Sequence, residues 1–86
     1  MVSYNLIIKE TAQKDIRHLH KPYIEAIVNK IKNLSENPRP QGTLKLSSEK
    51  DRWRLRVGDY RILYEIGDKE HIVTIYRVRH RKEVYR

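Results

Sequence analysis

Apolar and polar positions alternate along some segments of this chain and recur every three or four residues along others, and each period predicts a different element. Alternation from Val2 to Lys9 predicts a short strand. From Ala12 to Leu19 the apolar residues return at helical spacing, and Thr11 stands just before them in the position of a capping residue. The chain is therefore expected to open with a strand followed by a helix.

A second helix is predicted directly after the first. Pro22 suits the first turn of a helix, where its missing N–H has no partner to lose. Asn37 precedes Pro38, and a residue before proline avoids the helical region, so the helix should end before Asn37. Between these limits the apolar residues keep a helical spacing: Ile24, Ile27, Val28, Ile31 and Leu34. The two helices should form a hairpin that buries this stripe.

Beyond a polar connector at residues 38–50 the period changes to two. Strands are predicted at residues 53–57, 60–66 and 71–79, and Gly58-Asp59 has glycine first, as a type II′ hairpin turn requires. The fold class is then α+β: an N-terminal strand, a helix hairpin and a three-stranded antiparallel meander, with the helices packed on one face of a mainly antiparallel sheet. A length of 86 residues fits one domain, residues 1–86.

The tight turn also predicts which side chains share a face. If Val57 pairs with Tyr60, then Arg56 lies opposite Arg61, and the helices cover Trp53, Leu55, Val57, Tyr60, Ile62 and Tyr64. The three aromatic residues of that set are therefore expected in the core. The other face presents Arg54, Arg56 and Arg61 together, although like charges directly opposite each other destabilise a sheet. Two interpretations remain open: a solvated face with splayed arginines, or a cradle for phosphate.

Charge favours a polyanionic or acidic partner. The formal net charge is +8, and the last ten residues hold five basic residues against one acidic one. Arginine's planar fork suits bidentate binding of phosphate. Asp15, Glu25 and Glu36 look like solvated helix charges, and His18-x-His20 lacks a third metal ligand, so no metal site is expected.

The sequence also excludes several classes of protein. Cysteine is absent, which rules out disulfides, zinc–thiolate sites and thiol nucleophiles. No apolar stretch is long enough to span a membrane, and the N-terminus lacks the pattern of a secretion signal. We therefore expect a soluble cytoplasmic protein.

Two segments, WRLRVGDYRILYEI and YRVRHRKEVYR, resemble the RelE/ParE superfamily of bacterial and archaeal toxins, most closely the RelE-type branch. The resemblance spans the whole chain. It implies the toxin of a type II toxin–antitoxin system: a ribosome-dependent mRNA endonuclease, without cofactor, that acts on mRNA in the ribosomal A site. It also implies a cognate RelB-like antitoxin as partner, with a toxin–antitoxin heterotetramer as one assembly; part of the helix hairpin could hold an antitoxin segment.

The resemblance assigns roles to individual residues. Arg61 would stabilise the scissile phosphate, Arg81 would assist the leaving group, and Tyr85 would act as general base. His80 is an alternative acid or base. The expected RNA-binding residues are Lys45, Arg54, Arg56, Arg79 and Lys82.

The implied chemistry is attack of an RNA 2′-hydroxyl on the adjacent phosphorus, giving a 2′,3′-cyclic phosphate and a free 5′-hydroxyl. Because the pKa of arginine lies above about 12, Arg81 suits electrostatic assistance better than proton transfer. Two other functions stay open on the same sequence. One is a ParE-like inhibitor of DNA gyrase without nuclease activity, and the other is a basic binding module that has lost catalysis.

Overall fold

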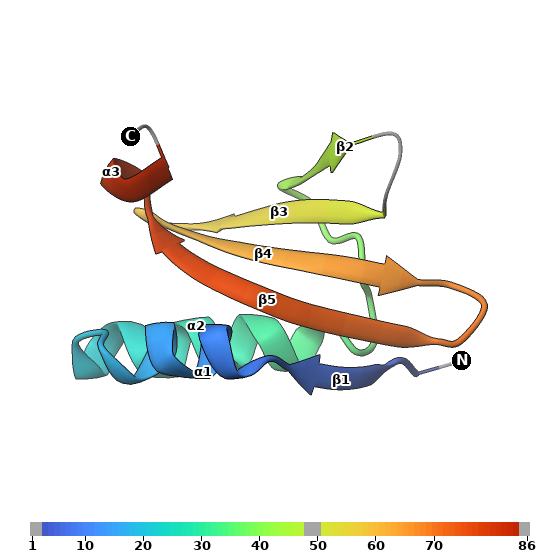
Figure 1. Ribbon diagram of the computed structural model, residues 1–86, viewed down its shortest axis with the longest axis horizontal. Helices are drawn as coiled ribbons and strands as arrows, with labels where there is room; N and C mark the ends of the chain where they lie inside the picture. Colours follow the sequence, from blue (N-terminus) through green and yellow to red (C-terminus); the bar gives the residue numbers. More distant parts are fainter. Residues whose placement is uncertain (1–2, 48–50, 85–86) are drawn as a thin grey trace.

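The structure, a computed structural model, describes residues 3–47 and 51–84. Its elements in chain order are β1 (Asn5–Ile8), α1 (Glu10–Arg17), α2 (Lys21–Asn33), β2 (Thr43–Ser47), β3 (Arg52–Val57), β4 (Tyr60–Gly67), β5 (Ile72–His80) and α3 (Arg81–Val84). α1 and α2 cover one face of the sheet, and α3 lies on the other side of it (Figure 1). The predicted α+β class, with the helix hairpin on one face, is confirmed.

The sheet has two strand pairings that the sequence did not reveal. It is five-stranded in the order β1-β5-β4-β3-β2. β1 runs parallel to β5, with Asn5 opposite Ile72 and Ile8 opposite Ile75, so the sheet is mixed. The connector predicted at residues 38–50 contains β2, which pairs antiparallel with β3. Among the described residues, no helix is long and apolar enough to cross a membrane.

The β3–β4 hairpin has the predicted register. Val57 lies opposite Tyr60, Arg56 opposite Arg61, and Trp53 opposite Tyr64. Gly58 has φ +59°, a left-handed conformation that glycine adopts without steric cost and that a type II′ turn needs at its first central position. The turn therefore determines how every later residue of β4 faces β3.

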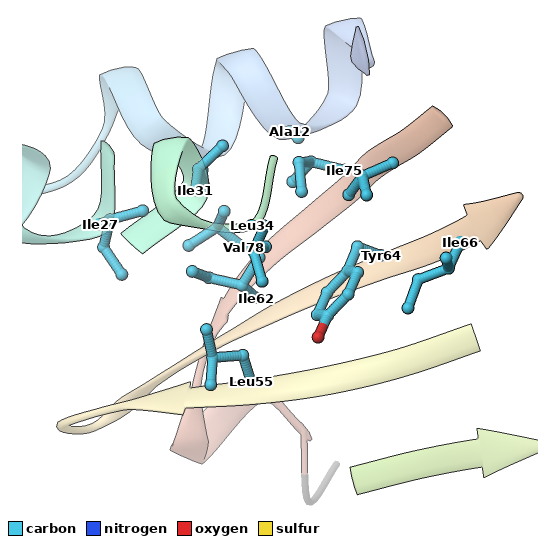
Figure 2. Packing of buried hydrophobic residues seen from close by; sticks show 11 residues of the cluster. Ala12, Ile27, Ile31, Leu34, Leu55, Ile62, Tyr64, Ile66, Ile75 and Val78 are labelled. Carbon is cyan, nitrogen blue, oxygen red and sulfur yellow. The ribbon is translucent and has the colours of Figure 1, made fainter. Parts of the chain in front are cut away.

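The core lies between the helix hairpin and the sheet (Figure 2). Tyr64 is fully buried there, as predicted, while Trp53 and Tyr60 pack against the core from its margin. The Tyr64 hydroxyl donates to the carbonyl oxygen of Pro38 at 2.8 Å and lies 3.1 Å from the Thr43 hydroxyl. Burial raises the pKa of Tyr64, so this phenol stays neutral and anchors the segment that leads into β2.

Side chains of α1 supply hydrogen-bond partners to the backbone of β5 beyond the end of β1. This finding corrects two predictions. Thr11 is not the helix cap: Lys9 occupies that position, and the Thr11 hydroxyl donates to the carbonyl oxygen of Tyr76 at 2.8 Å. Asp15 is not a solvated charge, because its carboxylate accepts the backbone N–H of Val78 at 2.9 Å and lies 2.9 Å from Arg77 Nε. The two side chains replace a missing neighbouring strand.

Replacing Asp15 should therefore destabilise the fold. We expect Asp15→Ala to lower the free energy of unfolding by about 2 kcal/mol, because the Val78 N–H loses its acceptor in a half-buried place. Asp15→Asn keeps an acceptor but loses the charge opposite Arg77, so its loss should be about 1 kcal/mol. Urea denaturation measures both. Glu25→Ala, on an exposed position of α2, is the matched control and should change stability by less than about 0.5 kcal/mol. Equal losses for Asp15→Ala and Glu25→Ala would contradict this account.

Candidate functional site

The sheet face turned away from α1 and α2 carries six arginines, which we call the arginine face. Along each strand these residues alternate with the buried ones, for example around Leu55, Ile62 and Val78. They are Arg52, Arg54 and Arg56 on β3, Arg61 on β4, and Arg77 and Arg79 on β5. α3 lies on the same side of the sheet, at the end where β5 stops (Figure 1).

Three of these arginines form a line across three adjacent strands, here called the arginine row. Arg56 lies opposite Arg61, and Arg61 lies opposite Arg79. Neighbouring strands are about 4.8 Å apart, so the three side chains start from closely spaced points. Arg61 is the middle member and is only 4% exposed, whereas Arg56 is exposed and its Nε donates to the carbonyl oxygen of Gly58 at 3.2 Å. The row concentrates positive charge over the centre of the sheet.

Acidic residues form ion pairs with arginines at the margins of the arginine face. Arg52 pairs with Glu65 at 3.0 Å, and Asp15 holds Arg77 at the outer edge of β5. In residues 3–47 and 51–84, no carboxylate forms an ion pair with Arg54 or Arg56. The Nε of Arg54 is buried and has no hydrogen-bond partner within those ranges. Uncompensated charge of this kind favours an anionic ligand such as phosphate.

α3 follows β5 directly and lies next to the β3–β4 turn. The backbone N–H of Arg81 donates to the carbonyl oxygen of Asp59 at 2.7 Å, and Arg81 Nη1 lies 3.7 Å from the Asp59 carboxylate. Arg81 and Lys82 are both exposed in the first turn of this short helix. The structure thus places Arg81 beside the β3–β4 turn, and the backbone N–H of Lys82 donates to His80 Nδ1 at 3.2 Å. Tyr85, the predicted general base, lies outside the described residues.

Two predicted site residues lie on the opposite side of the sheet from the arginine row. His80 pairs with Tyr60, and their rings meet edge to face with centroids 5.1 Å apart. Lys45 pairs with Trp53, and its Nζ lies 5.7 Å from the centre of the indole ring. Since residues directly opposite each other share a face, neither side chain joins Arg61. The expectation that His80 and Lys45 form one site with the row is therefore not supported by this geometry.

His80 instead lines a cavity of about 400 Å³ on the helix side, whose other lining residues are Asp15, His18, Leu19, His20, Tyr60 and Val78. Although several histidines meet there, the described residues contain no group of three or more histidine or acidic side chains placed to hold a metal ion.

Tyr76 also lies on the arginine face, although the sequence alone left open which face of the sheet it occupies. The β4–β5 pairing shifts between Leu63 and Tyr64, so Tyr76 is an extra residue in β5. The signal was present in the spacing of the apolar residues of β5: Val73 and Ile75 are two apart, but the next buried residue is Val78. A break in a period of two indicates a bulge, and here it turns Tyr76 and Arg77 toward the same face.

Comparisons with known proteins agree with this architecture. Residues 6–85 match the family model described as the ParE toxin of type II toxin–antitoxin system, parDE. Toxin RelG of Mycobacterium tuberculosis is 32% identical over 84 residues, 96% of this chain and 97% of RelG. In the RelBE2 toxin–antitoxin complex of M. tuberculosis, one chain superposes with a TM-score of 0.80 at 32% identity, covering 92% of this chain and 99% of that chain. The isolated Escherichia coli RelE toxin superposes with a TM-score of 0.78 at 29% identity, covering 96% and 92%. This chain belongs to the RelE/ParE superfamily of type II toxin–antitoxin toxins.

Proposed function

We propose that this toxin is a metal-independent endoribonuclease that cleaves mRNA in the ribosomal A site and thereby stops translation. The observation that carries the proposal is the arginine row, in which Arg56, Arg61 and Arg79 stand in register across three strands. Like charges directly opposite each other destabilise a sheet, and an anion bound at the row would offset that repulsion. The solved relatives that are RelE toxins favour the nuclease branch of the superfamily.

The row suits the charge that develops during cleavage. When the 2′-hydroxyl oxygen bonds to phosphorus, the phosphorane carries two negative charges on its equatorial oxygens. Guanidinium groups held by a sheet before the substrate arrives stabilise that charge without reorganising. Arg61 is the middle member of the row, and Arg54 and Arg56 on the neighbouring strand β3 hold the RNA backbone beside it.

Proton transfer is assigned to residues after β5. Tyr85 takes the proton of the 2′-hydroxyl, because positive charge of guanidinium groups favours the phenolate form of a tyrosine. Arg81 or Arg79 stabilises the departing 5′-oxygen electrostatically, and this oxygen takes its proton from solvent water as it leaves. Such a site lacks a well-matched acid and base, so the ribosome supplies the remaining rate enhancement by holding the mRNA in a reactive geometry. This function places the protein in the cytoplasm.

The partner proposed for the resting state is a RelB-like antitoxin. RelE-type relatives have been solved with RelB, in the RelBE2 complex of M. tuberculosis and in the intact E. coli RelBE complex. The net charge of +8 gives this toxin an electrostatic attraction to acidic segments of such a protein. A heterotetramer of two toxins and two antitoxins is the assembly we propose.

A second function has one specific observation in its favour, because the matching family model is that of ParE toxins. Mapping the 5′ ends of transcripts after a short pulse of expression separates the two. New 5′ ends within coding sequences are expected from the nuclease. Intact transcripts together with inhibited gyrase supercoiling would contradict the nuclease function and support the ParE-like function. Intact transcripts with normal gyrase activity would support a binding module that has lost catalysis.

Arg56→Thr should change stability and activity in opposite directions. Arg56 is exposed and lies opposite Arg61, so removing its charge relieves repulsion and should raise the free energy of unfolding by about 0.5 kcal/mol. Cleavage of ribosome-bound mRNA should fall by about tenfold, as expected on losing one guanidinium contact to the RNA backbone, worth about 1.4 kcal/mol. Arg17→Ala, on the exposed side of α1, is the control and should leave cleavage unchanged. A stabilised Arg56→Thr variant with full activity would show that the row is only a solvated face.

Arg79→Ala should impair cleavage more than Arg81→Ala does. Arg79 stands directly opposite Arg61, whereas Arg81 is exposed on α3 beside Asp59. Removing one group that stabilises transition-state charge costs about 100-fold in rate, and we assign that loss to Arg79. For Arg81→Ala we expect a loss of less than about tenfold. Single-turnover cleavage on programmed ribosomes measures both rates, and the reverse order would return the leaving-group role to Arg81.

A further inference from the structure

Tyr76 places an aromatic ring on the arginine face, next to the arginine row. As the extra residue of the bulge in β5, it turns toward this face together with Arg77. Its ring contacts confirm that side: the Arg52 guanidinium lies 5.2 Å from the centre of the Tyr76 ring, and Arg52 is a residue of the arginine face. The ring is partly exposed. A bulge that redirects one side chain beside a candidate site is typical of functional bulges.

The surroundings of Tyr76 are less polar than the row. Leu63 lies two residues along β4 from Arg61 and directly opposite Arg77. Asp15 holds the Arg77 guanidinium at the outer edge of β5, and Glu65 holds Arg52 at 3.0 Å. Tyr76 and Leu63 therefore give this part of the arginine face a small apolar area, between two arginines that are paired with carboxylates. We call these two residues the Tyr76 platform.

The Tyr76 platform and the arginine row are separated by the span of one nucleotide. Leu63 follows Arg61 by two residues on β4, a distance of about 6.7 Å along the strand. A phosphate on the row thus leaves its neighbouring base over the platform. Bases of single-stranded nucleic acid stack on aromatic rings without requiring one particular base.

Burial raises the pKa of the Tyr76 phenol, so this tyrosine remains neutral near pH 7. It offers a ring for stacking and no base for proton transfer.

We propose that Tyr76, with Leu63 beside it, binds the nucleobase next to the phosphate held by the arginine row. Tyr76 is in this assignment a binding residue that positions the RNA strand. The inference rests on the proposed function, because it takes the ligand of the arginine face to be RNA. It adds a second kind of contact: the row holds the backbone, and the platform fixes where the strand lies along the face.

The test measures binding of a single-stranded hexaribonucleotide that carries the fluorescent base 2-aminopurine at one position, moved along the strand in a series of probes. Stacking on an aromatic ring quenches this base. We expect the unmodified toxin to quench it at one position more than at the others. Tyr76→Leu should remove that quenching and weaken binding about tenfold, the scale of alanine substitutions at stacking aromatics. Tyr76→Phe should behave like the unmodified toxin, since it keeps the ring. Salt must be held constant, because phosphate contacts depend on it.

Tyr23→Leu is the matched control, since Tyr23 is a tyrosine with 49% exposure on α2, on the far side of the sheet. It should leave affinity and quenching unchanged. Equal affinity and quenching for Tyr76→Leu and the unmodified toxin would overturn the proposal.

If circular dichroism shows that Tyr76→Leu does not fold, the proposal is tested instead by binding of abasic probes to the unmodified toxin. Removing the base at the quenched position should weaken binding about tenfold, and equal binding of every abasic probe would overturn the proposal.

The assay reads binding and not cleavage, so it separates the two hypotheses. Quenching at one probe position, together with uncleaved transcripts in cells, would contradict the proposed nuclease function. It would still support the Tyr76 platform as an RNA-binding feature. No binding of the hexaribonucleotide by the unmodified toxin would overturn the platform, whatever transcript mapping shows.

Discussion

The register of the β3–β4 hairpin is the constraint on which the arginine row depends. Gly58 allows a two-residue turn, and the turn places Arg56 opposite Arg61. A slip of one residue would move every side chain of one strand to the other face, which would push guanidinium groups into the core and Ile62 into solvent. The cost of burying unpaired charge forbids that slip. The hydrophobic face that holds the helices thus also forces like charges together on the other face.

The bulge in β5 completes the row from the other side. With Tyr64 opposite Ile75, a strand without the extra residue would place Val78 opposite Arg61 and Arg79 on the helix side. The bulge shifts the pairing by one residue, so Val78 returns to the core and Arg79 reaches Arg61. α1 holds this irregular part of the edge strand through Thr11 and Asp15, which bond the backbone of Tyr76 and Val78. A helix that looks merely structural in sequence therefore helps to position the third arginine.

Local features were predictable from the sequence, and features that depend on distant segments were not. The hairpin register followed from Gly58 and a strict alternation, and the α2 stripe followed from Pro22 and apolar spacing. β2 was missed because its five residues sit among polar neighbours and are stabilised by pairing with β3. The role of Asp15 could not be read from helical periodicity, which tells which residues share a face but not what that face meets. Lys45 and His80 were grouped with the arginines by resemblance, yet strand alternation sends both to the other side.

Charge repulsion in the row connects the stability of this protein to what it binds. Arg61 is almost fully buried between two other arginines, and a domain of this size has little stability to spare. An anion that settles on the row relieves repulsion as well as making its own contacts, so binding and stability rise together. RNA phosphates and the carboxylates of an acidic partner are both suited to this. Under the proposed function, the same cluster would favour RNA when the toxin is free and an acidic segment when the toxin is held in a complex, and competition for one positive site would link the two states.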